Sequence, residues 1–443
     1  MPAQNYVLLE RVEVGEAAVS SITFNSIPQT GYTDLKIVVS GREVTGTSLL
    51  FTMQINGVAT NQSTREVRGS GSTATSGTNT IATIDQNGSG TTASTFGNAE
   101  IYIPNYTSAN YKSYSIDSVS ENNATAAYMR LSAGLWSSTA AITSLSFFPS
   151  SGNIAQYSTF SLYGLAAVGT TPTRAPKASG GSIIQTDGTY WYHAFLASGT
   201  FTPAVGLSCD VLSVAGGGGG SGNDFLGAGG GAGGLLYTTG ASFAASAYTV
   251  TVGAGGAGAT STPTAANKGN NTVISSYTAT GGGAGDSNLT YANGGSGGGG
   301  SNTTAGTGTS GQGNNGGISF YGASVSAGGG GGGAGAVGTA GISSKGGNGG
   351  AGTNTYSSWL TTIGQGGASG YLAGGGGGGT EASGGTIGTG GSGGGGSGGK
   401  YYTTTLATAG TVNTGGGGGG GANPSANPGK AGGSGILIIR YAV

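Results

Sequence analysis

The first 168 residues alternate between apolar and polar positions in short runs, the period of β-strands that bury one face. Turn sequences such as Asn56-Gly57 and Asn87-Gly88 separate the runs, and no stretch has a convincing helical period. Residues 69–95 are mostly Ser, Thr, Gly and Asn, which predicts a long loop with one strand near 81–84. The pattern predicts an all-β, jelly-roll-like sandwich over residues 1–168, with strands at 6–14, 22–24, 35–39, 49–55, 99–103, 111–119, 128–136, 142–148 and 159–165.

The pattern changes after residue 168. Residues 169–181 contain two prolines among small polar residues and are expected to form an extended linker. A short β-rich segment follows, with apolar runs at 190–195 and 210–214, and it leads into the first glycine block. The chain then closes on the aliphatic run 436–441. We expect this last run to pair with 211–214, so that residues 182–443 form one closed domain with a small β base.

Most of the 102 glycines lie in this second domain, in blocks such as 216–220, 328–333, 374–379 and 415–421. Polyglycine has no side chains to pack and loses much backbone entropy on ordering, so a flexible linker is the alternative that composition alone favours. The similar block lengths and the strands between blocks favour an ordered bundle of polyglycine II helices. Such a rod has three residues per turn, and a six-residue block spans roughly 19 Å.

Longer inserts separate the glycine blocks and carry aromatic residues among Asn, Ser and Thr, a composition typical of recognition loops. The alternative is that these rings fold back to cover the rods. The candidate binding residues are Tyr291, Phe320, Tyr321, Tyr356, Trp359, Tyr371, Tyr401 and Tyr402.

Composition excludes several classes of function. Only 7% of the 443 residues are charged and the formal net charge is −1, so no basic surface for nucleic acid or anionic lipid is expected. No apolar run is long enough to span a bilayer, and the first residues do not resemble a signal peptide. We therefore expect synthesis in a cytoplasm and no membrane insertion.

Catalytic chemistry is also sparse, and we expect no enzyme, cofactor or metal site. His193 is the single histidine and Cys209 the single cysteine. We expect a packed histidine and a buried, inert thiol rather than a nucleophilic pair. Carboxylates are too scattered after residue 190 for a glycosidase pair, although those of the first domain remain open. Residues 253–258 match G-x-G-x-x-G but precede no helix, so dinucleotide binding is not expected.

A family resemblance covers residues 190–443. The runs Ser-Gly-Thr-Phe-Thr at 198–202, Asp-Val-Leu-Ser-Val-Ala-Gly at 210–216, Gly-Gly-Leu-Leu-Tyr at 233–237, Tyr-Thr-Val-Thr-Val-Gly at 248–253 and Ile-Leu-Ile-Ile-Arg-Tyr at 436–441 occur in order. This combination resembles the glycine-rich domain of bacteriophage tail-fibre and receptor-binding proteins. Within that group it is similar to the distal adhesins of T-even-type long tail fibres, whose stacked polyglycine II rods carry receptor-binding loops.

The resemblance implies a virion protein that recognises a host cell-surface glycan or outer-membrane protein through the aromatic inserts. It also implies attachment to other virion proteins through the first domain and assembly as a homotrimer. The sandwich differs from the attachment domain of those adhesins, so tail and capsid positions both stay open. A structural or decoration protein of the virion is the main alternative. Ice binding is a further alternative, which the long aromatic inserts disfavour.

Overall fold

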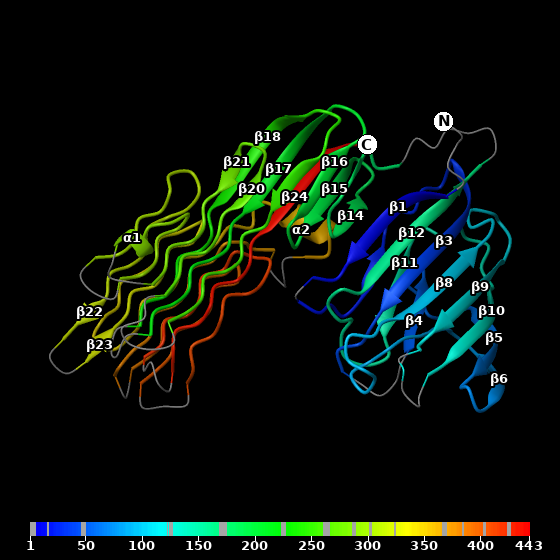
Figure 1. Cartoon of the computed structure of the whole chain (residues 1–443), viewed down its shortest axis with the longest axis horizontal. Coiled ribbons are helices and arrows are strands. Elements are labelled where there is room, and N and C mark those ends of the chain that lie inside the picture. Colours follow the sequence, from blue (N-terminus) through cyan, green and yellow to red (C-terminus); the bar gives the residue numbers. More distant parts are fainter. Residues whose placement is uncertain are drawn as a thin grey trace. The chain divides into compact units, whose positions relative to one another are not determined.

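The computed structural model describes residues 6–15, 17–45, 50–121, 123, 127–167, 175–222, 227–259, 266–285, 289–300, 304–322, 325–365, 370–382, 385–401, 405–422 and 427–443. The chain forms two compact units (Figure 1). The first comprises residues 1–177, 182–191 and 442–443, and the second comprises residues 178–181 and 192–441. Residues 169–174 of the expected linker lie outside the described residues, whereas Ala178–Ser179 forms the short strand β13 of the second unit.

The first unit is a β-sandwich, as its alternating sequence predicts. Its smaller sheet has the order β2 (Ile22–Phe24), β11 (Leu145–Pro149), β4 (Leu50–Ile55) and β7 (Ala82–Asp85). Its larger sheet has the order β14 (Ile183–Thr186), β1 (Tyr6–Glu13), β12 (Thr159–Ala166), β3 (Tyr32–Gly41), β8 (Gly97–Ile103), β9 (Lys112–Val119), β10 (Met129–Trp136), β5 (Gln62–Gly69) and β6 (Ala74–Asn79).

Aromatic side chains from both sheets form the core of the sandwich. Phe51 on β4 stacks on Phe160 on β12 with ring centroids 5.7 Å apart, and Phe147 on β11 lies 5.4 Å from Phe160. All three side chains are fully buried. Burying each large apolar side chain contributes about 1.5–3 kcal/mol, so these contacts across the two sheets hold the layers together.

Ionic side chains replace apolar ones at one end of this core. Arg130 on β10 is 3% exposed, and its Nε donates to Asp85 on β7 at 2.6 Å. Its Nη1 donates to Glu66 on β5 at 2.9 Å, and Arg68 also donates to Asp85 at 2.6 Å. Because each buried charge faces an opposite charge, the cluster avoids the large desolvation penalty of an unpaired ion.

The expected loop at 69–95 is partly wrong. Residues 82–85 form β7 near the expected position, but 74–79 form β6, which pairs in register with β5 (Arg65 opposite Thr78). β5 was itself missing from the expected strands. Neither strand has a periodic apolar face, because the inward side chains of β5 join the ionic cluster and β6 is the solvent-exposed edge of the sheet. Apolar alternation therefore could not reveal them.

The second unit has a β base. One part contains β18 (Leu235–Phe243), β17 (Leu207–Val214), β24 (Ile436–Ala442) and β15 (Tyr190–Phe195), in that order, and β15 leads into this unit from the first. The other part contains β13, β16 (Gly199–Pro203), β19 (Tyr248–Thr251), β20 (Thr272–Ile274) and β21 (Tyr277–Ala279). β17 and β24 are antiparallel, with Val211 opposite Ile439, which confirms the expected pairing of the last strand.

The glycine blocks form a bundle of straight rods that run from this base (Figure 1). Along residues 227–234, consecutive backbone N–H groups donate to different neighbouring rods, and N–H groups three residues apart donate to the same rod. Gly229 donates to Gly329 at 3.0 Å and Ala232 to Gly332 at 2.9 Å, both in one rod, whereas Gly230 donates to Gly418 in another at 2.8 Å. A three-residue period of lateral hydrogen bonds is the geometry of polyglycine II, so the blocks are ordered rods.

Glycine is required here by close approach between backbones. A Cβ added to Gly230 would lie 2.1 Å from the carbonyl oxygen of Gly218, and one added to Gly375 would lie 2.1 Å from that of Gly331. The rods are therefore packed too closely for any side chain at these positions. Lateral hydrogen bonds between buried peptide groups replace the side-chain core of an ordinary domain.

Helix is nearly absent from the described residues. The helices are α1 (Leu289–Ala292) and α2 (Ser357–Thr362), both in inserts between rods. Another insert contains the strands β22 (Phe320–Tyr321) and β23 (Ser326–Ala327), which form a small hairpin. Within the described part of the chain, no helix has the length and apolarity needed to cross a membrane.

Candidate functional site

The rods reverse direction at two ends of the second unit. One end carries the β base, and we call the opposite one the distal end. Figure 1 shows the β22–β23 hairpin at the distal end, far from β15, β17 and β18, whereas α2 lies beside the base strands. The aromatic inserts are therefore divided between the two ends of the bundle.

The β22–β23 hairpin places the most exposed of the candidate residues at the distal end. Phe320 pairs with Ala327 and Tyr321 with Ser326 across the hairpin. The Tyr321 side chain is 73% exposed, while Phe320 is half-buried. The hairpin leads directly into the rod that begins at Gly328, whose N–H donates to Gly379 at 3.0 Å. A hydrogen-bonded rod thus begins directly after the hairpin strand that pairs with Tyr321.

Tyr401 belongs to the same end. Ala327 forms a bridge with Thr380, and Thr380 forms one with Lys400, so three chain segments lie side by side there. The Tyr401 N–H donates to the Thr380 carbonyl at 3.0 Å, and the Tyr401 side chain is half-buried. Tyr402 lies outside the described residues. The structure therefore brings Phe320, Tyr321 and Tyr401 onto neighbouring segments.

Asn427 holds the backbone around Tyr401. This side chain is 2% exposed, and its Nδ2 donates to the carbonyls of Lys400 at 3.3 Å and Thr405 at 2.8 Å. Its Oδ1 accepts the N–H of Ala407 at 2.9 Å. The sequence does not predict this role of Asn427, because an isolated Asn in a Gly/Ala/Pro-rich segment carries no signal of its tertiary partners.

Tyr291 occupies a separate insert. It lies in α1, is 44% exposed, and its carbonyl accepts the N–H of Ala284 at 2.8 Å. Figure 1 shows α1 away from the base strands and apart from the β22–β23 hairpin. Tyr291 is thus available to solvent, in a different loop from Tyr321.

Trp359 and Tyr356 instead pack on the base. Trp359 is 4% exposed and makes edge-to-face contacts with Tyr192, Tyr237 and Tyr356, each at 5.9 Å between centroids. The guanidinium of Arg440 lies 4.2 Å from the Trp359 centroid. In this insert the aromatic rings fold back onto the base of the unit, which is the alternative that the sequence left open.

Tyr371 also belongs to the base end. Its side chain is half-buried, and Leu372, the next residue, pairs with Thr353 at the start of the α2 insert. Tyr356, Trp359 and Tyr371 are therefore separated by the length of the rods from Tyr321 and Tyr401.

Three exposed aliphatic residues extend the distal surface. They were not among the expected binding residues, which are all aromatic. Ile318, Ile342 and Leu406 are 47%, 54% and 52% exposed. The Gly341 N–H donates to the Ile318 carbonyl at 2.9 Å, and Lys400 donates to Thr405, next to Leu406, at 3.0 Å. Lone aliphatic residues in Gly/Thr-rich inserts were the available signal. We define the distal surface as Ile318, Phe320, Tyr321, Ile342, Tyr401 and Leu406.

His193 and Cys209 are both buried. His193 is fully buried, with Nδ1 2.7 Å from the Gly180 carbonyl and Nε2 2.9 Å from the Tyr441 hydroxyl. Burial lowers its pKa to about 4, so the ring is neutral at physiological pH. Cys209 is 1% exposed and burial raises its pKa to about 12, so the expected burial of this thiol is confirmed.

The described residues contain no group of three or more His, Cys, Asp or Glu side chains arranged to hold a metal ion. The G-x-G-x-x-G match at 253–258 forms part of a glycine rod. The Gly256 N–H donates to Gly217 in a neighbouring rod at 2.8 Å, and these backbone groups are occupied by rod packing.

The sequence of this same unit matches a known family. Residues 196–442, more than half of the chain, match the glycine-rich domain family, and they include the rods and the base strands from β16 onward. The chain belongs to the glycine-rich domain family. No curated protein is significantly similar to this chain. The matched segment contains both the distal surface and the strands that hold the rods.

Proposed function

We propose that this glycine-rich protein is a bacteriophage fibre protein or adhesin whose distal surface binds a host cell-surface receptor. The observation that carries the proposal is the exposure of Tyr321 and of the aliphatic residues Ile318, Ile342 and Leu406 on adjoining loops at one end of a rigid bundle. Exposed aromatic and aliphatic side chains on a polar background are typical of interaction surfaces.

The rods favour binding because they position the residues at their ends in advance. Each rod is fixed by backbone hydrogen bonds to several neighbours, and Asn427 donates to the carbonyls of Lys400, next to Tyr401, and Thr405. Backbone positioned before contact loses little further conformational entropy on binding, which strengthens a small surface. Copies of the protein on one virion multiply weak contacts through avidity.

The receptor class that this surface suits is a host glycan or an outer-membrane protein. Few charges accompany the distal surface, with Lys345, Lys400 and Glu381 in the described loops around it. In this proposal the first unit attaches the protein to other virion proteins and the protein assembles as a homotrimer. The structural alternative assigns the rods a spacer role and gives the distal surface no partner.

The proposal is tested by replacing Tyr321. The ring is 73% exposed, so Tyr321→Ala leaves folding intact and removes a central contact. Purified, labelled protein is added to candidate host bacteria, including one strain infected by virions that carry the protein. Loss of an aromatic hot spot costs about 2 kcal/mol or more, so cell binding is expected to weaken about thirtyfold.

Tyr111→Ala is the matched control, because it removes a tyrosine that is 59% exposed in the first unit. We expect this variant to bind cells like the wild type. Equal binding by both variants would contradict a receptor role for Tyr321. Absence of wild-type binding to the infected strain would favour the structural alternative.

A further inference from the structure

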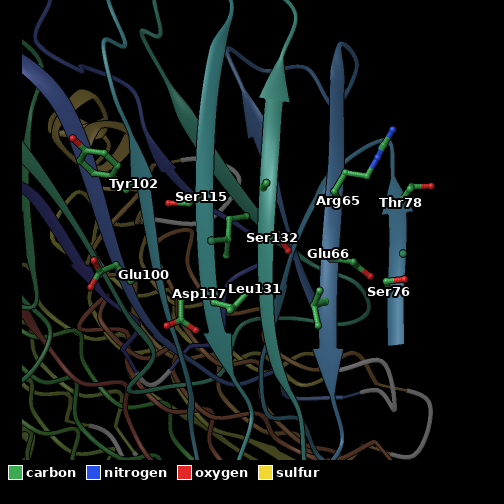
Figure 2. A pocket seen from close by; sticks show the side chains of 14 residues that line it. Arg65, Glu66, Ser76, Thr78, Glu100, Tyr102, Ser115, Asp117, Leu131 and Ser132 are labelled. Carbon is green, nitrogen blue, oxygen red and sulfur yellow. The ribbon is translucent and has the colours of Figure 1, made fainter. Parts of the chain in front are cut away.

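The first unit contains a groove of about 980 Å³ on the outer face of its larger sheet. Figure 2 shows the side chains that line it, which come from the five adjacent strands β8, β9, β10, β5 and β6. This face points away from the smaller sheet, because the inward residues of the same strands, such as Ile101, Tyr114 and Trp136, are buried. The volume is at the upper end of the range for ligand sites.

The middle of the groove is aliphatic. Leu131 on β10 lies directly opposite Val67 on β5, and the two side chains are 53% and 58% exposed. Ala133, two residues further along β10, adds to the same face beside Ser115. Adjacent aliphatic side chains this exposed on the open face of a sheet favour an interaction surface.

Polar groups border the aliphatic centre on both sides. On one side Asp117 is exposed beside Glu100, whose carboxylate pairs with Lys36 at 2.7 Å. Tyr102 adjoins them, and its hydroxyl donates to Asp34 at 2.5 Å.

Figure 2 shows Arg65, Ser76 and Thr78 on the opposite side, from β5 and β6. The rows run continuously across the strands, since Asp117, Leu131, Val67 and Ser76 are successive cross-strand partners. The groove thus offers carboxylates, hydroxyls and one guanidinium around an apolar strip.

The charge and shape of the groove select its occupant. The groove has little net charge, because Lys36 pairs with Glu100 and Arg65 offsets Asp117, so it offers no charge complement to nucleic acid or acidic polysaccharide. A second copy of the same face would oppose one hollow with another, and so would leave both apolar strips poorly covered. A neutral chain that is rich in hydroxyls and has apolar C–H faces matches both the polar borders and the aliphatic strip.

We propose that this groove binds a neutral polysaccharide chain, with its C–H faces on Leu131 and Val67 and its hydroxyls on Asp117, Ser76 and Thr78. The five strands span about 19 Å at the usual strand spacing, enough for several sugar units lying across them. This site is independent of the distal surface. It gives the first unit a binding role in addition to virion attachment.

The test is affinity electrophoresis of the full-length protein in gels that contain a neutral glucan, mannan or galactan, beside gels with alginate or no polysaccharide. We expect at least one neutral polysaccharide to retard the wild type. Leu131→Asp places a carboxylate on the apolar strip and is expected to weaken the affinity at least tenfold. Asp117→Asn, nearly isosteric, is expected to weaken it by a smaller factor.

Val58→Asp is the matched control, because Val58 is 42% exposed next to the smaller sheet, outside the groove. It is expected to migrate like the wild type, as is Tyr321→Ala, which separates this site from the distal surface. Thermal denaturation confirms that each variant is folded. The proposal is overturned if no neutral polysaccharide retards the wild type, if only alginate does, or if folded Leu131→Asp is retarded as strongly as the wild type.

Discussion

Replacing a single buried glycine by alanine tests whether the rods are as tightly packed as the structure shows. The Cβ of Gly230→Ala would lie 2.1 Å from the Gly218 oxygen, whereas ordinary contacts begin near 3.4 Å. The rods must therefore separate by about 1.3 Å. Gly218 donates to Gly231 and Ser221 donates to Ala228, both at 2.9 Å, between these same two rods, and this separation stretches such bonds beyond hydrogen-bonding range.

The cost follows from those two bonds. Leaving two buried peptide hydrogen bonds unmade costs about 1–3 kcal/mol each, and the residual strain adds about 1–3 kcal/mol. The loss of at least 3 kcal/mol, to order of magnitude, is a large part of the stability of a typical domain. For a unit of this size it lowers Tm by about 6 °C or more.

Differential scanning calorimetry of the full-length protein measures this effect. Gly206→Ala is the matched control, because Gly206 is exposed and its Cβ would meet nothing closer than the Phe243 oxygen at 4.0 Å. We expect a shift within about 1 °C for Gly206→Ala, typical of surface substitutions. A Gly230→Ala protein that melts within 2 °C of the control, on the order of the shift from 1 kcal/mol, would refute the close packing.

Three further predictions concern stability. Glu43 is fully buried, and its burial raises the pKa to about 7 from 4.5, so the folded state holds an extra proton between these pH values and loses up to about 3 kcal/mol of stability as the pH rises from 4.5 through 7. Urea unfolding at pH 5 and 7.5 should show this decline in the wild type but not in Glu43→Gln. An equal change of unfolding free energy with pH in the two proteins would contradict it. Trp359→Ala removes a buried ring from the base and should cost about 3–5 kcal/mol, measured by thermal unfolding, whereas a cost below about 1 kcal/mol would place this ring outside the core. Asp85→Ala removes a buried carboxylate partner of the Arg130 guanidinium and should lower the free energy of unfolding in urea by about 3–5 kcal/mol. Glu100→Gln, at an exposed ion pair, should lower it by less than about 1 kcal/mol. Similar losses for the two variants would contradict the role of burial.

The sequence predicted the strands whose buried face is apolar. The runs near β3, β9 and β10 alternate because one face packs in the sandwich, and the aliphatic run at 436–441 indicated a buried central strand. β5 was missed because its inward positions include Glu66 and Arg68, which join buried ion pairs. A strand that contributes charges to a core has no hydrophobic period to detect.

The sequence also predicted ordered rods but not the end at which each insert emerges. Every reversal between rods exchanges the two ends, and some reversals are short and unmarked, such as the turn in which Gly333 donates to Ala336. The positions of Trp359 and Tyr321 depend on how many such turns precede them. Composition therefore identified both rings as candidates, although only the tertiary structure separates a base residue from an exposed loop residue.

The central proposal, that the distal end contacts the host, is tested most directly by blocking each end of the bundle in turn. Cys209 is buried, so a bulky maleimide polymer labels only an introduced cysteine in the folded protein. Ile342→Cys places the label at the distal end, and Val205→Cys, at a side chain 51% exposed, places it at the base. We predict that only the label at residue 342 abolishes binding to the host strain. Undiminished binding with that label, or loss of binding with the label at residue 205 alone, would contradict the account.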